Sequence, residues 1–496
     1  MPTRGFRCQH LPRFQSTLHR QPELTMAAAE RVVVMDNGAA SLKVGFAGEV
    51  APRKEMPNCI VRGKGAKRQY VADQVESCED IQSLTFRRPF DRGYVVSWET
   101  QKEIWDRAFY TILKVKPSEC SLLVTEPPFN LPSIQSSMDE MVFEEYGFRA
   151  CHVALPAVLS HRHVATSEPA STLARGGSSL VVDCGFSFTH TVPIFDGFPV
   201  SHAVRRLNLG GKALTNYLKE LVSYRAWNMM EETAIIEDVK EKLCFVSLDI
   251  PGDLVLARPP GVGNPVRCEY VLPDGVKHKR GFVKDPEAAS AFLKRRRLDP
   301  AADEAEPREP QADSAVQSGK PDASNREEGS AERNPRGVGP AHDSADGKPD
   351  EAADGKKGRN VVDQVLALTN ERFLVPEMLF HPADLGVNQA GLADCIVESI
   401  SATQKDLQPL LYSNILLTGG STLFPGFRER LELELRPLVP DEFDVRIFTP
   451  QRPSLSAWLG GSEFAASDEF SASAITKSEY EELGSYRCRR KALHLC

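Results

Sequence analysis

Short apolar segments alternate along the chain with longer segments whose apolar residues recur at helical spacing. The segments 31–36, 178–183 and 413–418 each carry an apolar run that ends at a polar residue, one or two positions before a glycine. Continuous apolar runs of this length are typical of buried strands. Their alternation with amphipathic helices predicts an α/β architecture.

Two segments show the helical pattern most clearly. The first begins after Asn130, which we expect to cap the helix, with Pro132 in its first turn. Its apolar positions share one helical face and are Ile134, Met138, Met141 and Val142. The second helix follows Thr233, and its apolar stripe consists of Ile235, Ile236, Val239 and Leu243. Lys240 and Glu241 lie near the edge of that stripe.

The composition sets the scale of the protein. Its 496 residues, 41% of them hydrophobic, are enough for a large core and for two or three domains or lobes. No window approaches the roughly 18 to 20 continuous apolar residues of a membrane span, so we expect a soluble chain without a membrane partner. The eleven cysteines include no Cys-x-x-Cys pair, which favours a reducing compartment over a zinc module or a disulfide framework.

A polar segment interrupts the second half of the chain. Residues 299–354 hold 15 acidic and 6 basic residues, a local charge of −9, and because the whole chain carries −8 the remainder carries +1. A segment this polar buries too few apolar side chains to offset the conformational entropy lost on ordering. The composition therefore predicts a disordered acidic insertion over 285–360. The nearly neutral remainder argues against strong independent DNA binding.

The first 28 residues form a second atypical segment. Four arginines precede the first acidic residue, Glu23, and this composition is similar to that of a mitochondrial transit peptide. Met26 lies close to the first predicted strand. Residues 1–28 are therefore interpreted either as a dispensable disordered extension before a working start at Met26 or as a targeting signal.

Two aspartates at strand ends carry the strongest indication of chemistry. Residues 36–38 (Asp-Asn-Gly) and 183–185 (Asp-Cys-Gly) each join two apolar strands through a tight turn. One such turn alone indicates only a hairpin. Two copies 147 residues apart predict duplicated lobes around a cleft, where backbone N–H groups face a polyphosphate. Asp36 and Asp183 would then hold a hydrated Mg²⁺, and Lys43 would neutralise phosphate oxygens.

A third turn follows the apolar segment at 413–418. Gly419 and Gly420 stand there, ahead of a predicted helix at 427–431, and paired glycines let a backbone approach a ligand closely. Taken alone they indicate a strand-to-helix turn. When the glycine pair follows two Asp-x-Gly turns along the chain, the order of the three motifs resembles the nucleotide clamp of the actin, Hsp70 and sugar-kinase fold.

The resemblance to the actin family extends over almost the whole chain outside the insertion. Segments similar to actin lie at 93–98, 123–126, 157–160, 240–244 and 456–461. Segments that most resemble the nuclear actin-related proteins lie at 89–94, 125–130, 133–138 and 187–190. The resemblance implies an actin-like domain with two lobes around a nucleotide cleft.

This domain would span residues 29–484. The small lobe would cover about 29–165 and 456–484, the large lobe about 166–455, and a C-terminal tail would follow at 485–496. The resemblance also implies ATP or ADP with Mg²⁺ in the cleft. The residues that would touch the phosphates or the waters of the metal are Asp36, Asn37, Gly38, Lys43, Asp183 and Gly185. Those that would line the nucleoside side are Lys240, Glu241, Gly419, Gly420 and Phe424.

Several positions at this cleft depart from the actin pattern. Pro156 stands where actin has the glutamine that orients the attacking water, and Phe186 stands where actin has a second acidic residue. Ala39 replaces a serine of the first turn, and Ser454 replaces a lysine near the adenine. His190 is kept, although a histidine beside a hydrophobic strand is more often a satisfied core residue than a base. Because hydrolysis needs a water held in line, these departures predict a degenerate ATPase that retains nucleotide as a structural ligand.

The resemblance further implies a non-catalytic subunit of a SWR-type chromatin-remodelling complex, which exchanges a variant histone into nucleosomes and so regulates transcription. Its partners would be the other subunits, with histones and nucleosomal DNA met only within the complex, in the nucleus and also in the cytoplasm. The basic runs at 294–297 and 356–359 would serve nuclear import or be solvated loop charges. The acidic insertion would mimic DNA toward histones or remain inert solvated chain.

Two other functions stay open. One is an independent nucleotide-hydrolysing ATPase or small-molecule kinase of the same superfamily, which Pro156 and Phe186 disfavour. The other is a cytoskeletal, filament-forming actin-related protein. In filaments of actin a longer mobile loop inserts into the next subunit, whereas the matching stretch at 61–70 is short and basic. Filament formation is therefore not expected.

Overall fold

The apolar segment that precedes the first Asp-x-Gly turn forms strand β1 (Val32–Asn37), inside a six-stranded mixed sheet. β1 runs parallel to β9 and antiparallel to β2. The strand order is β20 (Ile475–Thr476), β10 (Ala150–Ala154), β9 (Ser121–Thr125), β1, β2 (Ser41–Phe46) and β3 (Lys54–Pro57). Helices pack on this sheet, which explains the continuous apolar run of β1.

The second large sheet repeats this arrangement. Its strand β11 (Ser179–Cys184) runs parallel to β18 and antiparallel to β12, as β1 does to β9 and β2. The order is β13 (Phe198–Pro199), β12 (Thr189–Phe195), β11, β18 (Ile415–Thr418) and β19 (Ile447–Phe448), with β14 (Arg205–Leu207) paired to β12. The predicted α/β fold with duplicated strand–turn–strand units is confirmed.

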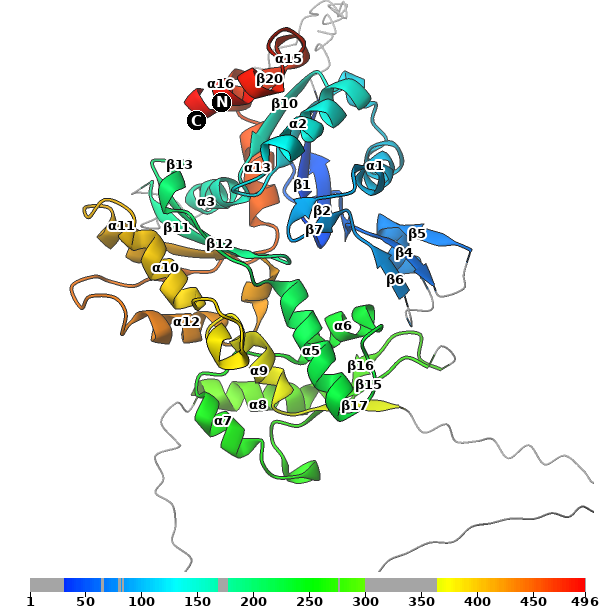
Figure 1. Ribbon diagram of the computed structural model, residues 1–496, viewed down its shortest axis with the longest axis vertical. Coiled ribbons are helices and arrows are strands. Elements are labelled where there is room, and N and C mark those ends of the chain that lie inside the picture. The colour runs from blue at the N-terminus through cyan, green and yellow to red at the C-terminus, as the bar shows by residue number, and fades with distance from the viewer. Residues whose placement is uncertain are drawn as a thin grey trace, which may run out of the picture. The chain divides into compact units, whose positions relative to one another are not determined.

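Two helices lie side by side between the large sheets (Figure 1): α3 (Pro156–Ser167) and α13 (Ser456–Ala465). α13 contacts β1 and α3 contacts β11. The buried indole of Trp458 donates to the carbonyl of Val34 at 3.1 Å. A Cβ on Gly460 would lie 1.8 Å from the carbonyl oxygen of Leu159, so only glycine permits this close contact between the helices.

The structure, a computed structural model, describes residues 31–63, 67–78, 82, 84–167, 177–274, 277–298 and 364–495. The predicted extension at 1–28 and residues 299–360 of the predicted insertion lie outside the described residues. The chain divides into two units, Met1–Ala289 with Gln364–Cys496 and Ser290–Asp363. Both large sheets belong to the first unit.

The predicted disorder over 285–360 begins too early. Residues 286–298 form helix α8 (Pro286–Leu298). The Asp285 carboxylate accepts the amide of Ala288 at 2.9 Å, as a capping residue does, and Pro286 stands in the first turn. The helix formers that follow favour this conformation despite their polarity.

The small lobe is completed by a three-stranded sheet, a hairpin and two helices. The sheet consists of β5 (Gln69–Val71), β4 (Ile60–Gly63) and β6 (Leu84–Arg87), and the hairpin of β7 (Phe90–Asp91) and β8 (Tyr94–Val95). The helices are α1 (Trp98–Asp106) and α2 (Pro132–Glu140), and each continues into a π-helical turn. The predicted cap of α2 is wrong, because Leu131 occupies the capping position and Asn130 instead accepts the amide of Leu131 at 3.0 Å.

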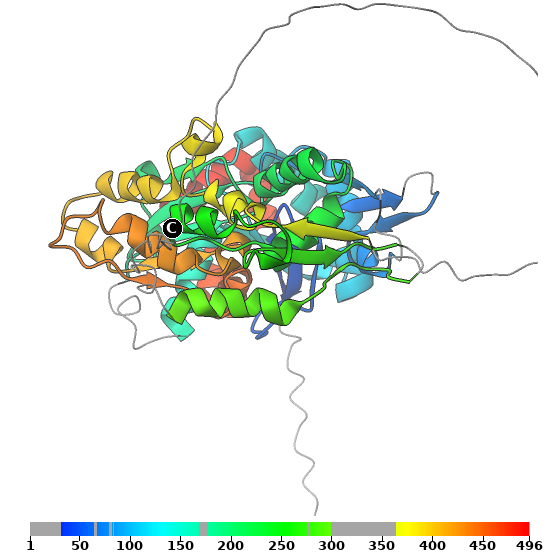
Figure 2. The same cartoon turned by 90° about the horizontal axis from the view of Figure 1, so that it is seen from below.

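Besides α8, the large lobe adds a small sheet and seven α-helices among the described residues. In the sheet β15 (Cys268–Val271) lies between β16 (Phe282–Val283) and β17 (Val365–Leu368), and Figure 2 shows the yellow β17 beside β15. The helices are α5 (Gly211–Arg225), α6 (Thr233–Leu243), α7 (Ile250–Leu256), α9 (Glu371–Glu377), α10 (Leu392–Ser401), α11 (Gln408–Tyr412) and α12 (Phe427–Leu435). α6 confirms the second predicted helix, with its whole apolar stripe buried.

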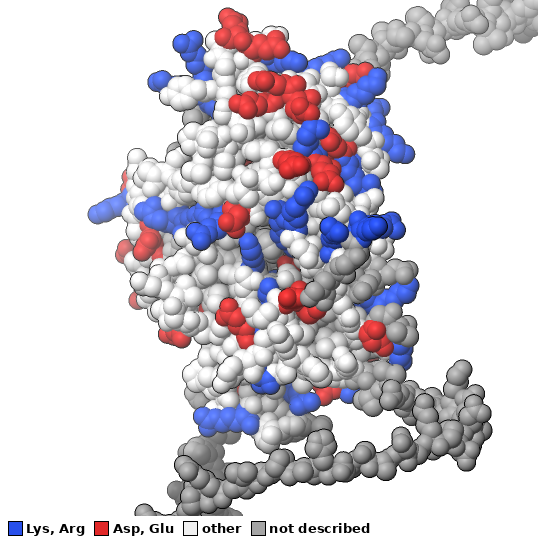
Figure 3. Space-filling model, turned by 45° about the vertical axis from the view of Figure 1, so that its right-hand side comes forward, with Lys and Arg blue, Asp and Glu red and all other residues white. Residues whose placement is uncertain are grey.

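Three helices end the chain: α14 (Asp468–Ser473), α15 (Lys477–Leu483) and α16 (Ser485–Leu495). The predicted C-terminal tail is thus helical over Ser485–Leu495. Within the described part of the chain no helix is long and apolar enough to cross a membrane. Figure 3 shows acidic and basic side chains interspersed over one face, with acidic groups gathered toward its top and basic groups in a band across its middle.

Candidate functional site

All eleven residues that the sequence predicts around a nucleotide line one cavity, between the turn that joins β1 to β2 and the turn that joins β11 to β12. The cavity volume is about 550 Å³, within the range of roughly 300 to 1,000 Å³ that is typical of small-molecule sites. The positions that depart from the actin pattern, Ala39, Pro156, Phe186 and Ser454, line the same cavity. The structure therefore brings the predicted site together, while its ligand contacts stay a prediction.

The first turn places a carboxylate and an ammonium group directly opposite each other. Asp36 and Lys43 are partners in the antiparallel register of β1 and β2, and Lys43 Nζ lies 2.9 Å from Asp36 Oδ2. Thr125, at the end of β9, donates to Asp36 Oδ1 at 2.8 Å. Burial alone would lower the pKa of Lys43, but the Asp36 carboxylate outweighs it and raises this pKa above its ordinary value. Lys43 is therefore a stable cation at the cavity wall.

The backbone of the first turn is held from behind by Asn58. Its amide nitrogen donates to Asn37 Oδ1 at 3.2 Å and to the carbonyl of Gly38 at 2.9 Å. Gln101 donates to Asn58 Oδ1 at 3.3 Å in turn. The side chain of Asn37 thus serves the turn itself. Neither Asn58 nor Thr125 was predicted, although Thr125 ends an apolar run as Asp36 does.

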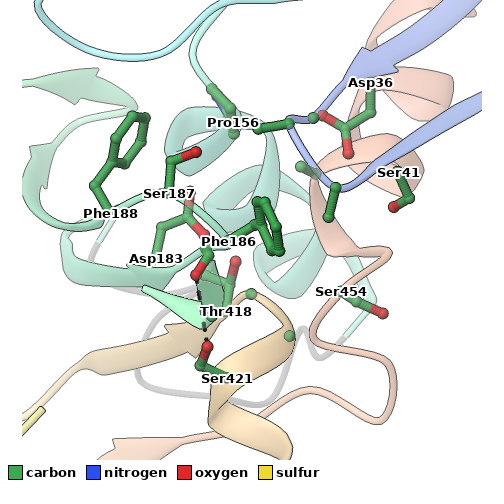
Figure 4. Close-up of a pocket in the computed structure, with 18 of the residues that line it drawn as sticks. Asp36, Ser41, Pro156, Asp183, Phe186, Ser187, Phe188, Thr418, Ser421 and Ser454 are labelled. Carbon is green, nitrogen blue, oxygen red and sulfur yellow. Dashed lines mark hydrogen bonds between the residues drawn. The ribbon is translucent and has the colours of Figure 1, made fainter. Parts of the chain in front are cut away.

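The second turn is closed by its own backbone. Gly185 donates its N–H to the carbonyl of Phe188 at 3.0 Å, and its carbonyl accepts the amide of Gly211 at 3.1 Å and the hydroxyl of Ser421 at 3.5 Å. The last bond is dashed in Figure 4. Asp183 is half-buried. Desolvation and the negative charge of Asp36 raise its pKa to about 6, although the positive charge of Lys43 acts to lower it.

The glycine pair after β18 lets this strand approach the second turn. Gly419 has a φ of 91°, and a Cβ there would lie 2.3 Å from the carbonyl oxygen of Cys184. A Cβ on Gly420 would meet nothing within 4 Å. Gly419 is therefore needed for the close approach of the strands, whereas Gly420 leaves open space at the cavity.

Lys240 and Glu241, on the predicted nucleoside side, differ in their surroundings. Lys240 is buried, and its ammonium group donates to Thr215 Oγ1 at 3.0 Å and to the carbonyl of Gly211 at 3.3 Å. It therefore fixes the start of α5. Glu241 is exposed at the cavity rim. Phe424 is buried and supplies an apolar wall.

His190 is buried without a hydrogen-bond partner among the described residues. It is 1% exposed, and neither ring nitrogen is bonded. The Phe188 ring lies 4.4 Å away, edge to face. Burial, with a smaller effect of the Arg206 charge, lowers the pKa of His190 to about 3, so the ring is neutral at pH 7. The expectation of a satisfied core histidine is wrong: the ring is buried, but its nitrogens are unsatisfied.

A divalent cation fits this site only as a hydrated ion. The described residues contain no group of three or more His, Cys, Asp or Glu side chains placed to hold a metal. Mg²⁺ keeps several of its waters and needs few protein ligands. The pair of Asp36 and Asp183, one carboxylate from each turn, meets that requirement.

The duplicated sheets, the two Asp-x-Gly turns and the glycine pair around one cavity define a class of protein, and sequence comparison identifies it. The family model of Actin matches residues 27–493. The chain therefore belongs to the actin family.

Comparison with individual proteins shows which members of the actin family this chain is similar to. Actin-related protein 6 of Oryza sativa subsp. indica is 48% identical over 470 residues, which is 95% of this chain and 100% of that protein. Actin-related protein 6 of Arabidopsis thaliana is 47% identical, with 93% and 99% covered, and that of Dictyostelium discoideum is 36% identical, with 93% and 94% covered. The segment resemblances described above, which favour an actin-related protein over conventional actin, agree with these relatives.

Proposed function

We propose that the chain is a non-catalytic, actin-related subunit of a SWR-type chromatin-remodelling complex, and that it supports the exchange of a variant histone into nucleosomes. The similarity to actin-related protein 6 over nearly the full chain supports this role. In this proposal the cleft keeps the structure of a nucleotide site without catalysing hydrolysis, and the surfaces around it bind the other subunits.

The position of Pro156 is the main support for the proposal that the chain does not catalyse ATP hydrolysis. It begins α3 and lines the cavity, as Figure 4 shows, beside the turn that holds Asp36. Proline has neither a side-chain amide nor a backbone N–H with which to orient a water. The Phe186 ring points from the second turn toward the first and adds an apolar surface. Without an orienting group, in-line attack on a phosphate loses most of its advantage.

The remaining residues suit the retention of ATP or ADP with Mg²⁺ as a structural ligand. Lys43 would neutralise phosphate oxygens, the glycines of the two turns would allow close approach, and Asp36 with Asp183 would hold the waters of the ion. Phe424 would pack against the base. A ligand that binds only the folded chain stabilises it by mass action.

The proposal places the chain in the nucleus and also in the cytoplasm, without filaments and without a membrane partner. The hairpin of β4 and β5 exposes Arg62, Lys67 and Arg68. These charged side chains do not supply the complementary apolar contact that a heterologous filament interface needs. Histones and nucleosomal DNA would be met within the complex.

A second candidate, an independent nucleotide-hydrolysing actin-like ATPase, is favoured by one observation. The eleven predicted nucleotide residues still line one cavity, with the Lys43 cation in place. Recovery of the tagged chain from nuclear and cytoplasmic extracts separates the candidates. We expect a remodelling ATPase and a variant histone in the nuclear eluate, in amounts near that of the chain. Recovery of the chain alone, or with filaments, would refute the proposal.

The same purification tests the acidic insertion. A chain that lacks residues 299–354 should recover the same subunits if the insertion is inert solvated chain. A selective loss of histones, with the subunits retained, would instead support mimicry of DNA. Histone exchange measured with the shortened chain then decides between the two interpretations.

A further inference from the structure

Contacts between the two lobes gather on the hairpin of β7 and β8, outside the predicted ligand residues. Arg92 and Gly93 form its turn with φ of 45° and 79°, the left-handed conformations that two-residue hairpins favour. A Cβ on Gly93 would lie 1.7 Å from Cε1 of Phe188. The Phe188 ring, which belongs to the second turn in the large lobe, therefore packs directly on the backbone of a small-lobe turn.

Arg206, on β14 in the large lobe, joins the same hairpin. Its guanidinium carbon lies 4.4 Å from the centre of the Phe188 ring and 5.1 Å from that of Tyr94. The guanidinium donates to the Tyr94 hydroxyl at 2.7 Å and to the carbonyl of Arg92 at 3.1 Å. One side chain of the large lobe thus holds a side chain and a carbonyl of the small lobe, while it stacks on a ring of its own lobe.

A second arginine makes a similar contact in the opposite direction. Arg88, between β6 and β7 in the small lobe, lies 4.7 Å from the centre of the Phe186 ring. It also pairs with Glu237 on α6 at 3.3 Å, and the two side chains are only 15% and 22% exposed. Phe186 and Phe188, two positions apart in the second turn, therefore each stack on an arginine. The stack of Phe186 on Arg88 crosses the cleft, whereas Phe188 crosses it through its contact with Gly93.

We propose that these residues form a clasp that keeps the two lobes closed when the cleft holds no nucleotide. The clasp consists of Arg88, Tyr94, Phe186, Phe188 and Arg206 with the turn at Arg92 and Gly93. In a two-lobed clamp a bound ligand can hold the lobes together. Here the rings of Phe186 and Phe188 in the second turn also contact the small lobe. Nucleotide then enters a cleft that is already closed, and its binding adds little to the cohesion of the lobes.

The chain offers a matched pair of variants to test this inference. Arg206→Gln removes the guanidinium from the clasp. Arg205→Gln changes the neighbouring residue of β14, which donates to two carbonyls of its own lobe, those of His202 and Val204. Hydrogen–deuterium exchange of the full chain, stripped of nucleotide with EDTA and apyrase, is followed in peptides that cover 89–96 and 185–190.

The wild-type chain should protect both peptides without nucleotide, and saturating Mg·ADP or Mg·ATP should change their exchange by less than about twofold. Arg206→Gln should raise exchange at least about fivefold in both peptides, since it removes two hydrogen bonds to the small lobe, one to Asn208 and the contacts with two rings. Arg205→Gln should leave exchange within about twofold of wild type. Tyr94→Phe keeps the ring and loses the bond from Arg206 together with the long bond to the carbonyl of Phe129 at 3.4 Å. Its exchange should fall between those of the two arginine variants, and it replaces Arg206→Gln if that variant does not fold.

Equal exchange in the Arg205 and Arg206 variants would overturn the clasp, and so would a tenfold fall in wild-type exchange when nucleotide is added. The inference rests on the proposed function only for the identity of the ligand. The comparison of the two arginine variants needs no ligand, so the clasp can stand if the chain binds no nucleotide or joins no remodelling complex. The proposed function fails instead in the purification experiment.

Discussion

Arg489 on α16 offers a demanding test of the structure, because its side chain, together with the Ser485 hydroxyl that donates to Asp139 at 2.6 Å, holds the C-terminal helix on α2. Its guanidinium donates twice to Asp139, at 2.7 Å each, to both carboxylate oxygens of Glu126 at 3.0 and 3.2 Å, and once to the carbonyl of Gln135 at 3.1 Å. The arginine side chain is 15% exposed and each carboxylate side chain 8%. Burial alone would lower the pKa of Arg489, but Asp139 and Glu126 outweigh it and raise this pKa well above its ordinary value.

Arg489→Ala would leave Asp139 and Glu126 buried with no arginine between them. Removal of one partner from a buried ion pair costs about 3 to 5 kcal/mol. The full cost applies only while α16 stays docked, because undocking of the helix lets water reach both carboxylates. At about 1 to 2 °C per kcal/mol for a folded unit of this size, we expect the melting temperature to fall by about 5 °C.

Thermal melting followed by circular dichroism measures this shift, and hydrogen–deuterium exchange in 485–495 reports the undocking directly. Arg487→Ala is the matched control, since Arg487 lies two positions away on the same helix and is exposed. Its substitution should shift the melting temperature by less than about 1 °C, as surface changes do. Equal shifts in the two variants, or unchanged exchange of α16 in Arg489→Ala, would refute the structural argument.

Three further predictions concern the cleft and its supports. Pro156→Gln should raise ATP turnover of the purified chain at least about tenfold, because it restores an orienting amide; an actin-like rate in the wild type with no increase in the variant would contradict this. Gly419→Ala should destabilise the chain by about 2 kcal/mol or more and Gly420→Ala by less than about 1 kcal/mol in denaturant titrations, since only the first forces a Cβ against a carbonyl and a positive φ; equal losses would be inconsistent with the turn geometry. Burial lowers the pKa of His161 to about 4, so its contribution to stability is full above about pH 6.5 and is lost as the pH falls toward 4, at about 1.4 kcal/mol per pH unit. His161→Gln should therefore flatten the fall in the free energy of unfolding between pH 7 and 5, and parallel profiles would exclude this effect.

The two Asp-x-Gly turns were the part of the site most open to prediction, because their geometry is local. An apolar strand, an aspartate and a glycine fix a hairpin within about ten residues, and the repeat then indicates two lobes. The glycine after β18 was predicted for the same reason. Its contact with Cys184, which makes Gly419 necessary, became visible only in the structure.

The clasp could not be predicted, because its contacts join residues far apart in the chain. Arg206 and Tyr94 are separated by 112 positions, and no local pattern distinguishes Arg206 from Arg205. Lys240 shows the same limit: the resemblance placed it beside the nucleoside, and it does line the cavity, but only the structure shows that its ammonium group is bound by a hydroxyl and a carbonyl of α5. Side chains that are polar by type but buried by topology are found only when the elements around them are placed.

The predicted capping role of Asn130 failed for a local reason. Asn130 is a favoured capping residue, and Pro132 fits an early helical position, so the sequence pattern was reasonable. The helix nevertheless begins one position later, because Asn130 uses its side chain on the amide of Leu131. Competition between two nearby amides for one side-chain oxygen is decided by small backbone differences.

The central claim is that this member of the actin family works as a non-catalytic subunit of a remodelling complex. The most direct measurement is the exchange of a variant histone into nucleosomes by the purified complex, assembled with and without this chain, in the presence of ATP. We predict that exchange is lost without the chain and returns when it is added, although the chain alone hydrolyses no ATP above background. Equal exchange by the two assemblies would contradict the account.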